Sequence, residues 1–310
     1  MKLIAFTLAT IICCNAFAGP PIIFGEGIIS TNGDEFGGTF TPDGKTVFFS
    51  KSVLRFYIDV ICYSEFRNGK WEEPKVAPFS GQYRDFDPVI SPDGSKMVFT
   101  SKRPVNGVEK ADYDIWMVTR TASGKWSDPI HLDSSINSEY DEHFASISAS
   151  GNIYFSSNRP GALGGDGDAD FYLAEFTDGH YPSAEHLKES STASYELDCF
   201  VAADESFLLL GVYGGQGGMG NYDINISEKV DGAWTASRNL GAPVNSPFRD
   251  YSPRVSPDGK YLYFTSERDF SVTEGKVFTE YKDLKAKLTG VLNGSGNIYK
   301  IELEPLRKKG

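Results

Sequence analysis

A short turn sequence recurs along the chain at intervals of about fifty residues, and it restricts the possible folds more than any other feature. The tripeptide Pro-Asp-Gly occurs at 42–44, 92–94 and 257–259. Two degenerate copies, 148–151 and 202–205, occupy the corresponding places between them. With the proline position as anchor, the anchors are residues 42, 92, 149, 203 and 257, spaced by 50, 57, 54 and 54 residues. Such a period indicates an array of similar supersecondary units.

Each repeat predicts four short strands. One strand leads into the turn, where proline presets φ and Asp and Gly suit the following positions, and an apolar strand leaves it. A polar or glycine-rich loop then precedes a third strand, and a Gly-x-Trp turn precedes the outer one. We expect the tryptophans of these turns to pack between units: they are Trp71, Trp126 and Trp234. The third strands are expected at 57–63, 114–118, 170–174, 223–227 and 297–303. Four strands in about 50 residues are typical of a β-propeller blade.

The two ends of the chain complement one another. The last repeat has little chain left for a fourth strand, whereas the segment 21–30 before the first repeat resembles an outer strand. We therefore predict an all-β, five-bladed propeller of four-stranded antiparallel blades, in which the N-terminal strand completes the last blade and removes a free edge. Helical periodicity is confined to 280–292, which predicts a short inserted helix. The alternative is six blades, with the extra blade built around that segment.

These motifs also carry a family resemblance. The order Ser-Pro-Asp-Gly, apolar strand, Ser-x-Arg, glycine-rich loop and Asp-aromatic strand is present in 91–116 and 256–268, and its later part in 156–172. It resembles the PD40, or WD40-like, repeat of TolB-type propellers over nearly all of the chain after residue 18. The resemblance implies protein binding or periplasmic scaffolding, and in some relatives cleavage of polysaccharides or peptides. Blades 3 and 4 depart from the Pro-Asp-Gly turn, and blades 1 and 4 lack Ser-x-Arg.

The N-terminus predicts export. Lys2, an apolar stretch and the small residues around Ala18 have the form of a signal peptide over residues 1–18, with cleavage after Ala18 and a single propeller domain over 19–310. The expected location is the periplasm or the exterior. No other segment approaches the length of a transmembrane helix. After cleavage two cysteines remain, Cys62 and Cys199, in blades that are not neighbours, so we expect two buried free thiols.

The formal net charge of −12 argues against nucleic-acid binding, because phosphate recognition requires a basic footprint. An acidic exported protein suits a protein partner, a cationic ligand or a divalent metal. We expect a monomer whose partner is a protein, peptide or glycan of the cell envelope or exterior.

An acidic residue recurs seven positions before every anchor. Two more acids, Asp87 and Asp198, follow two residues later on the same strand face in blades 2 and 4. The structural interpretation is that the recurring acids pair with turn amides and with the Ser-x-Arg arginines Arg103, Arg159 and Arg268. The functional interpretation is that part of the ring lines the channel mouth as a ligand site and binds, for example, calcium. The five recurring acids are Glu35, Asp85, Glu142, Glu196 and Asp250.

The catalytic candidates are Glu142 and His143, the one histidine in the ring region. No nucleophile elbow or phosphate loop is present, and no cysteine–histidine set has zinc spacing. The acidic loop 164–170 lacks the distal glutamate of an EF-hand, so we interpret it as a turn rather than a metal site. The favoured hypothesis is a non-enzymatic binding or scaffold module. The alternative is a polysaccharide-active hydrolase or lyase that uses channel carboxylates, with or without a metal.

Overall fold

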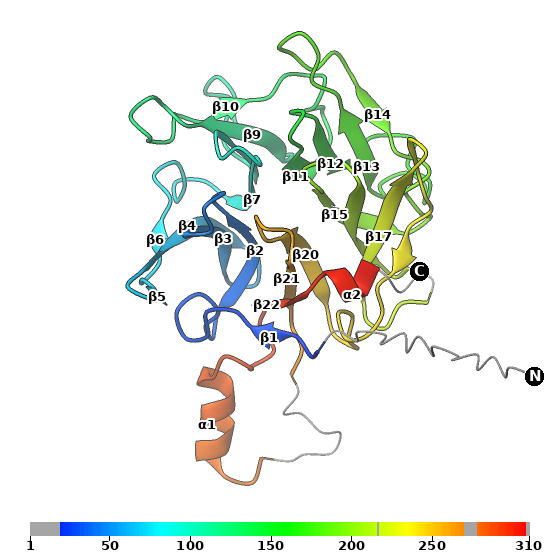
Figure 1. Cartoon of the computed structure of the whole chain (residues 1–310). Helices are drawn as coiled ribbons and strands as arrows, with labels where there is room; N and C mark the ends of the chain where they lie inside the picture. Colours follow the sequence, from blue (N-terminus) through cyan, green and yellow to red (C-terminus); the bar gives the residue numbers. More distant parts are fainter. Residues whose placement is uncertain (1–18, 216, 270–277, 308–310) are drawn as a thin grey trace, which may run out of the picture.

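The computed structural model describes residues 19–215, 217–269 and 278–307, and these form five antiparallel sheets around a common axis (Figure 1). The predicted five-bladed propeller is therefore confirmed, and the described residues form no sixth blade. The predicted signal peptide at 1–18 lies outside the described residues.

Each blade contributes one strand to each of four concentric positions. The innermost strands, which open blades 1 to 5, are β2 (Asp34–Phe40), β7 (Asp85–Ile90), β11 (Glu142–Ile147), β15 (Tyr195–Val201) and β20 (Asp250–Val255). The second strands are β3 (Thr46–Val53), β8 (Lys96–Ser101), β12 (Ile153–Ser157), β16 (Phe207–Tyr213) and β21 (Tyr261–Ser266). The third strands are β4 (Ile58–Arg67), β9 (Asp114–Thr119), β13 (Asp170–Ala174), β17 (Tyr222–Val230) and β22 (Asn297–Glu302). The outer strands are β6 (Lys75–Val76), β10 (Ile130–His131), β14 (Ala184–His186), β19 (Arg238–Asn239) and β1 (Ile22–Ile23). Short hairpins extend the third strands of blades 1 and 4 through β5 (Lys70–Trp71) and β18 (Ala233–Trp234).

The innermost strands close the ring. β2 lies against β7, β7 against β11, β11 against β15, β15 against β20, and β20 against β2 again. The last blade combines both ends of the chain, because β1 pairs antiparallel with β22, with Ile22 opposite Lys300. The predicted closure by the N-terminal strand is thus confirmed. It brings both chain ends into one sheet and covers the edge of β22.

Apolar side chains from neighbouring blades form the core. The second strands are almost continuously buried, and their residues alternate between the two blade interfaces on either side of each sheet. The tryptophans of the Gly-x-Trp turns pack across these interfaces: the Trp126 ring lies 6.0 Å from that of Phe48 in blade 1, and Trp234 6.1 Å from Tyr154 in blade 3. Cys62 and Cys199 are buried free thiols, as predicted.

The anchor turns are held by side-chain caps. In blade 2 the Ser91 hydroxyl donates to Asp93 at 2.6 Å, and the Ser95 hydroxyl and amide donate to the same carboxylate. These hydrogen bonds favour the ionised form and lower the pKa of Asp93 to about 2. Blades 3 and 4 build the turn without the Pro-Asp-Gly sequence and still form complete sheets.

The predicted helix is present as α1 (Tyr281–Thr289), and a short second helix, α2 (Glu304–Arg307), follows β22. α1 projects from the rim of the ring between β21 and β22, and none of its residues is buried (Figure 1). Within the described parts of the chain, no helix has the length and apolar character needed to cross a membrane.

Candidate functional site

A bulge interrupts every innermost strand and sorts its side chains. The register with the second strand shifts within each pair, for example between Phe86 and Val89 in blade 2 and between Tyr251 and Arg254 in blade 5. Ahead of the bulge, strand alternation places successive side chains on opposite faces: the recurring acid contacts the Ser-x-Arg motif of its own blade, where the blade has one, and the next residue lines the channel. Two successive positions of one repeat therefore build two different layers.

The outer layer is the acid ring, and in three blades it is a set of buried ion pairs. Asp85 accepts hydrogen bonds from the Arg103 guanidinium and the Ser101 hydroxyl, both at 2.6 Å. Arg159 reaches Glu142 at 3.0 Å, and Arg268 reaches Asp250 at 2.5 Å. The backbone N–H groups of the preceding turns donate to the same carboxylates, at 2.7 Å from Ser138 to Glu142 and from Ser246 to Asp250. The pairing with the Ser-x-Arg arginines that the sequence suggested is present at all three.

In the two blades without Ser-x-Arg, other groups surround the buried carboxyl group. In blade 1, Lys51 reaches Glu35 at 2.6 Å and Thr31 donates both its N–H and its hydroxyl. In blade 4, the contacts of the described residues give Glu196 no cation, and its Oε2 atom is buried without a hydrogen-bond partner. Burial raises the pKa of Glu196 to about 8, against the lowering effect of Thr192, and nearby Asp170 adds to the rise.

The inner layer is a ring of mostly aromatic side chains that the sequence interpretation missed. They stand six positions before each anchor and so directly follow the recurring acids: Phe36, Phe86, His143, Leu197 and Tyr251. The signal was available in the sequence, because four of these five positions carry a ring. It becomes meaningful only once strand alternation shows that this position faces the channel.

These rings line a cavity of about 240 Å³ at one mouth of the channel. Further rings come from Tyr113, which precedes β9, from Tyr222, the first residue of β17, and from Phe56 at the tip of blade 1. The Phe36 ring packs edge-on against Phe56 with centroids 5.5 Å apart. We call this cavity the aromatic mouth. Its complete lining is Phe36, Phe56, Asp59, Arg84, Phe86, Tyr113, His143, Phe144, Tyr195, Leu197, Asp198, Tyr222, Arg249 and Tyr251.

Two arginines stand at the aromatic mouth, one position before the recurring acids of blades 2 and 5. The Arg84 guanidinium lies 5.3 Å from the Tyr113 ring centroid and pairs with buried Asp59 through Nε at 2.6 Å. The Arg249 guanidinium lies 5.2 Å from the centroids of both Tyr222 and Tyr251. About a third of each arginine side chain stays exposed, 31% for Arg84 and 35% for Arg249.

The predicted site residues Glu142 and His143 lie on opposite faces of β11. Glu142 belongs to the ion-pair layer, whereas the His143 ring lies 4.8 Å from Tyr113 and 5.7 Å from Phe144 in the aromatic mouth. Burial lowers the pKa of His143 to about 4, which makes the imidazole neutral at physiological pH, and Lys102 and Arg84 add to the lowering. Burial also raises the pKa of Glu142, although its hydrogen bonds with Ser138 and Ser157 oppose this.

A charged cluster blocks the channel below the aromatic mouth. The fully buried Arg254 guanidinium pairs with Asp87 at 2.5 Å, and the Ser252 hydroxyl donates to Asp198 at 2.8 Å. Among the described residues, Asp87 Oδ1 and Arg254 Nε have no hydrogen-bond partner. Burial raises the pKa of Asp87 to about 7; Arg254 opposes the shift and Asp198 adds to it. Gly37 permits the close packing, because a Cβ there would lie 2.6 Å from Asp87 Oδ1.

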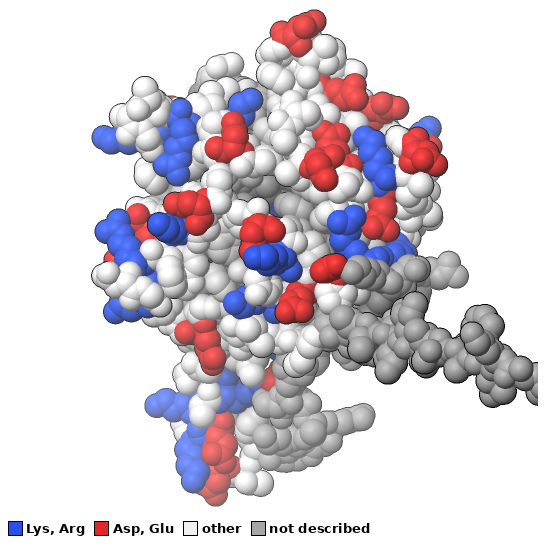
Figure 2. All heavy atoms as spheres, in the orientation of Figure 1, with Lys and Arg blue, Asp and Glu red and all other residues white. Residues whose placement is uncertain are grey.

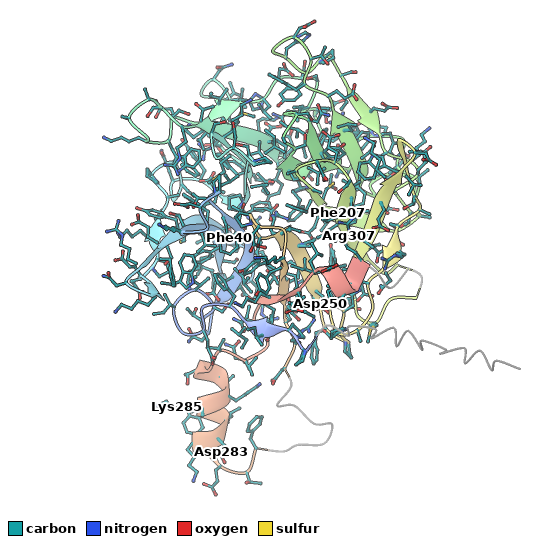
Figure 3. All side chains as sticks on the ribbon, in the orientation of Figure 1. Phe40, Phe207, Asp250, Asp283, Lys285 and Arg307 are labelled. Atoms are coloured by element: carbon teal, nitrogen blue, oxygen red, sulfur yellow. The ribbon has the colours of Figure 1, made fainter. Side chains whose placement is uncertain are left out.

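A larger cavity of about 480 Å³ opens beyond this cluster, at the end of the channel formed by the anchor turns. Arg254 forms its floor, and Phe40, Phe207 and Arg307, all labelled in Figure 3, stand around it near the middle of the ring. Neither the recurring acids nor the inner aromatic layer lines it. Lys, Arg, Asp and Glu side chains are interspersed over the face drawn in Figure 2 without a basic patch.

The loops around the aromatic mouth carry most of the exposed large apolar side chains of the described residues. These loops join the second and third strands of each blade. The tip of blade 1 is the most prominent, with Leu54 72% and Tyr57 75% exposed. The other exposed residues in these connections, with the adjoining strand ends and the inserted helix α1 included, are Val53, Ile58, Val108, Leu163, Tyr213, Met219, Phe278, Tyr281 and Leu288.

The tip of blade 1 is also strained. Leu54, Arg55 and Phe56 all have left-handed backbone angles, with φ of 57°, 52° and 67°. Such angles cost L-residues of order 1 kcal/mol each and persist only where the surroundings impose them. Here the Ser52 hydroxyl accepts the Phe56 N–H at 2.8 Å. The turn thereby directs Phe56 into the aromatic mouth while Leu54 and Tyr57 stay exposed.

The described residues contain no group of three or more His, Cys, Asp or Glu side chains arranged to hold a metal ion. Calcium binding therefore stays a prediction. In the acidic loop, Leu163 N–H donates to Asp170 at 2.8 Å, and His186 contacts the same carboxylate at 2.6 Å.

No family model matches the chain, and no curated protein matches it. Solved structures do. TolB from Acinetobacter baumannii is 17% identical with a TM-score of 0.49, over 88% of this chain and 55% of that one. A TolB candidate from Agrobacterium tumefaciens is 16% identical with a TM-score of 0.49, over 87% and 91%. A gluconolactonase from Xanthomonas campestris is 14% identical with a TM-score of 0.46, over 82% and 81%. The chain thus spans little more than half of the first of these proteins; its own strand pairings establish the propeller.

Proposed function

We propose that this protein is a non-enzymatic binding module that holds a protein partner on the face around the aromatic mouth. This proposal rests on one observation: a cavity lined by aromatic rings and exposed apolar loop tips lie on the same face. Contiguous exposed apolar surface with a polar surround marks interaction sites on proteins. Because aromatic anchors in desolvated pockets dominate the energy of many interfaces, the cavity suits the central anchor of such a contact.

The size of the aromatic mouth supports recognition of a single side chain. Pockets for drug-sized ligands measure roughly 300–1,000 Å³, and this one measures about 240 Å³. The rings are locked by packing against one another, for example Phe86 against Tyr113 with centroids 5.4 Å apart. A pre-formed cavity of this kind reduces the entropy lost on binding, because few side chains must be ordered when the partner arrives.

The contacts of the ring carboxylates favour binding over the hydrolase alternative. A general acid and base need carboxyl groups that can reach a substrate. Glu142 instead accepts hydrogen bonds from Ser138, Ser157 and Arg159, and it is fully buried. His143, although it faces the aromatic mouth, is surrounded by rings and has no carboxylate hydrogen-bonded to it within the described part of the chain.

Site-specific photocrosslinking tests the proposal. A photoreactive phenylalanine analogue replaces Tyr57 at the aromatic mouth, and in a matched control it replaces Phe66, which is exposed at the opposite end of the same blade. In cells that express the protein, we expect one discrete product from position 57 and none of that size from position 66. Filling the cavity with Leu197→Trp should remove the product, while circular dichroism and the thermal midpoint stay near the wild-type values.

The alternatives give different results. Equal products from both positions, or no product from position 57, would contradict a partner at the aromatic mouth. A product that survives proteinase treatment of the crosslinked sample would assign this face to a glycan instead of a protein.

A further inference from the structure

The guanidinium groups at the aromatic mouth are arranged for a ligand of a particular charge. Both arginines occupy the same position of the repeat, immediately before the recurring acid, in the two blades that flank blade 1. The other three blades have Asp34, Asp141 and Tyr195 there. The two cations are therefore specific to one side of the aromatic mouth and are not a general feature of the fold.

Each arginine is oriented by a carboxylate behind it. Asp59, which is 1% exposed, binds Nε of Arg84, and Glu267 binds Nη1 of Arg249 at 3.0 Å. Arg84 also interacts with the Tyr113 hydroxyl. Among the described residues these are the side-chain hydrogen bonds of the two guanidinium groups. A guanidinium has five N–H donors, so each arginine retains donors that can bind a ligand.

Stacking holds the planes of both guanidinium groups in place. Arg84 lies over Phe86 and Tyr113, and Arg249 lies over Phe56 at 5.6 Å. A stacked and ion-paired guanidinium loses little further conformational entropy when it binds an anion, and its planar fork matches a carboxylate. Between the two arginines, the rings of Phe36 and Phe56 offer an apolar surface.

We propose that the partner segment presents an aromatic side chain flanked by carboxylates, with the ring inserted in the aromatic mouth and the carboxylates bound by Arg84 and Arg249. This inference rests on the proposed function and specifies its ligand. The ligand is an acidic peptide segment of a protein, because the cavity accepts one side chain and the two cations lie at its rim.

Peptide display on the whole protein tests the inference. A random twelve-residue phage library is selected on the wild type, and binders that also bind Leu197→Trp are removed, so that the peptides retained depend on the open cavity. We expect enriched peptides with Trp, Tyr or Phe next to Asp or Glu. Cavity-dependent peptides with neutral or basic flanks would overturn the inference and leave the proposed function standing. If no cavity-dependent peptide is enriched, both fail.

Calorimetry on one enriched synthetic peptide gives the magnitude. Arg249→Gln should weaken binding about tenfold or more, since hydrogen bonds to charged groups are among the stronger ones. The paired change Asp59→Asn with Arg84→Gln should act similarly without leaving an unpaired buried carboxylate. Arg67→Gln, on the exposed outer hairpin of blade 1, is the control and should bind like wild type. Replacing the peptide acids by amides should remove the difference between wild type and Arg249→Gln; if the difference persists, the arginines do not contact those acids.

Discussion

Blades 2 and 4 place the same carboxylate position in opposite surroundings. Asp85 of blade 2 stands opposite Ser101, and Arg103 two residues further on reaches it at 2.6 Å. Glu196 of blade 4 stands opposite Val212, and the residue two positions further on is Gly214, so neither hydroxyl nor guanidinium is supplied. Both carboxyl groups are fully buried.

The comparison shows two ways in which one fold accommodates a buried acid. Blade 2 compensates the carboxylate with a cation and hydroxyl groups. In blade 4, burial raises the pKa of Glu196, so that its neutral form is favoured up to about pH 8. An unpaired buried carboxylate is costly, and taking up a proton is the general way to avoid that cost. The shape of the blade is kept in both cases, because in both blades the acid pairs with the second strand and the register shifts by one residue after it.

The largest effect is expected from removing the cation of blade 2. Arg103→Met leaves Asp85 buried with only the hydroxyl groups of Ser80 and Ser101. Breaking a buried pair in this way costs about 3–5 kcal/mol in the free energy of unfolding. Urea denaturation at pH 7 measures the loss. Asp85→Asn combined with Arg103→Met should recover part of it, because no charge then stays unpaired. A loss below about 1 kcal/mol for Arg103→Met would show that the ion pair does not distinguish the two blades.

A pH-dependent effect on stability is expected in blade 4. Because the folded-state pKa of Glu196 lies above its usual value of 4.5, the folded state binds more protons, and stability falls as pH rises from about 4.5 to about 8. Glu196→Gln should remove this contribution, so the variant gains stability relative to wild type between pH 5 and pH 8.5. Asp87 has a raised pKa as well and should leave a residual slope in the variant.

Urea denaturation of both proteins at the two pH values measures that gain. Glu185→Gln, an exposed position on β14 of the neighbouring blade, is the matched control and should follow the wild-type slope. A Glu196→Gln variant that is equally displaced from wild type at both pH values would contradict a protonated Glu196.

Most of the fold was predictable because the features that define a blade are local. The anchor turns, the apolar second strands and the Gly-x-Trp turns repeat within single units, and two degenerate turns still produce complete sheets. Closure by the N-terminal strand followed from the missing outer strand of the last repeat. The arginine partners of Asp85, Glu142 and Asp250 followed from a motif inside the same blade.

The aromatic mouth was less accessible from sequence, because it is assembled from positions that meet only in three dimensions. Acidity at one position drew the prediction to the carboxylates, whereas the layer that faces the channel is the next residue along each strand. His143 has the same position as Phe36 and Phe86 in their blades, which a search for catalytic groups does not reveal. Arg254 was missed for a related reason: its partner Asp87 lies 167 residues away in another blade.

The smallest effect is expected in blade 1. Its recurring acid has a cation partner, unlike that of blade 4, but the cation is more exposed than in blade 2. Lys51 pairs with Glu35 at 2.6 Å, but the lysine side chain is 40% exposed, so solvent screens the pair. Glu35 also retains two hydrogen bonds from Thr31 in the absence of the lysine. Lys51→Met should therefore cost about 1 kcal/mol in urea denaturation at pH 7, well below the cost of Arg103→Met. If Lys51→Met and Arg103→Met cost the same, the cation alone would determine the stability of the buried acid. If Lys51→Met cost nothing, the hydrogen bonds from the turn would be enough to stabilise the acid, and the lack of a cation in blade 4 would not affect stability.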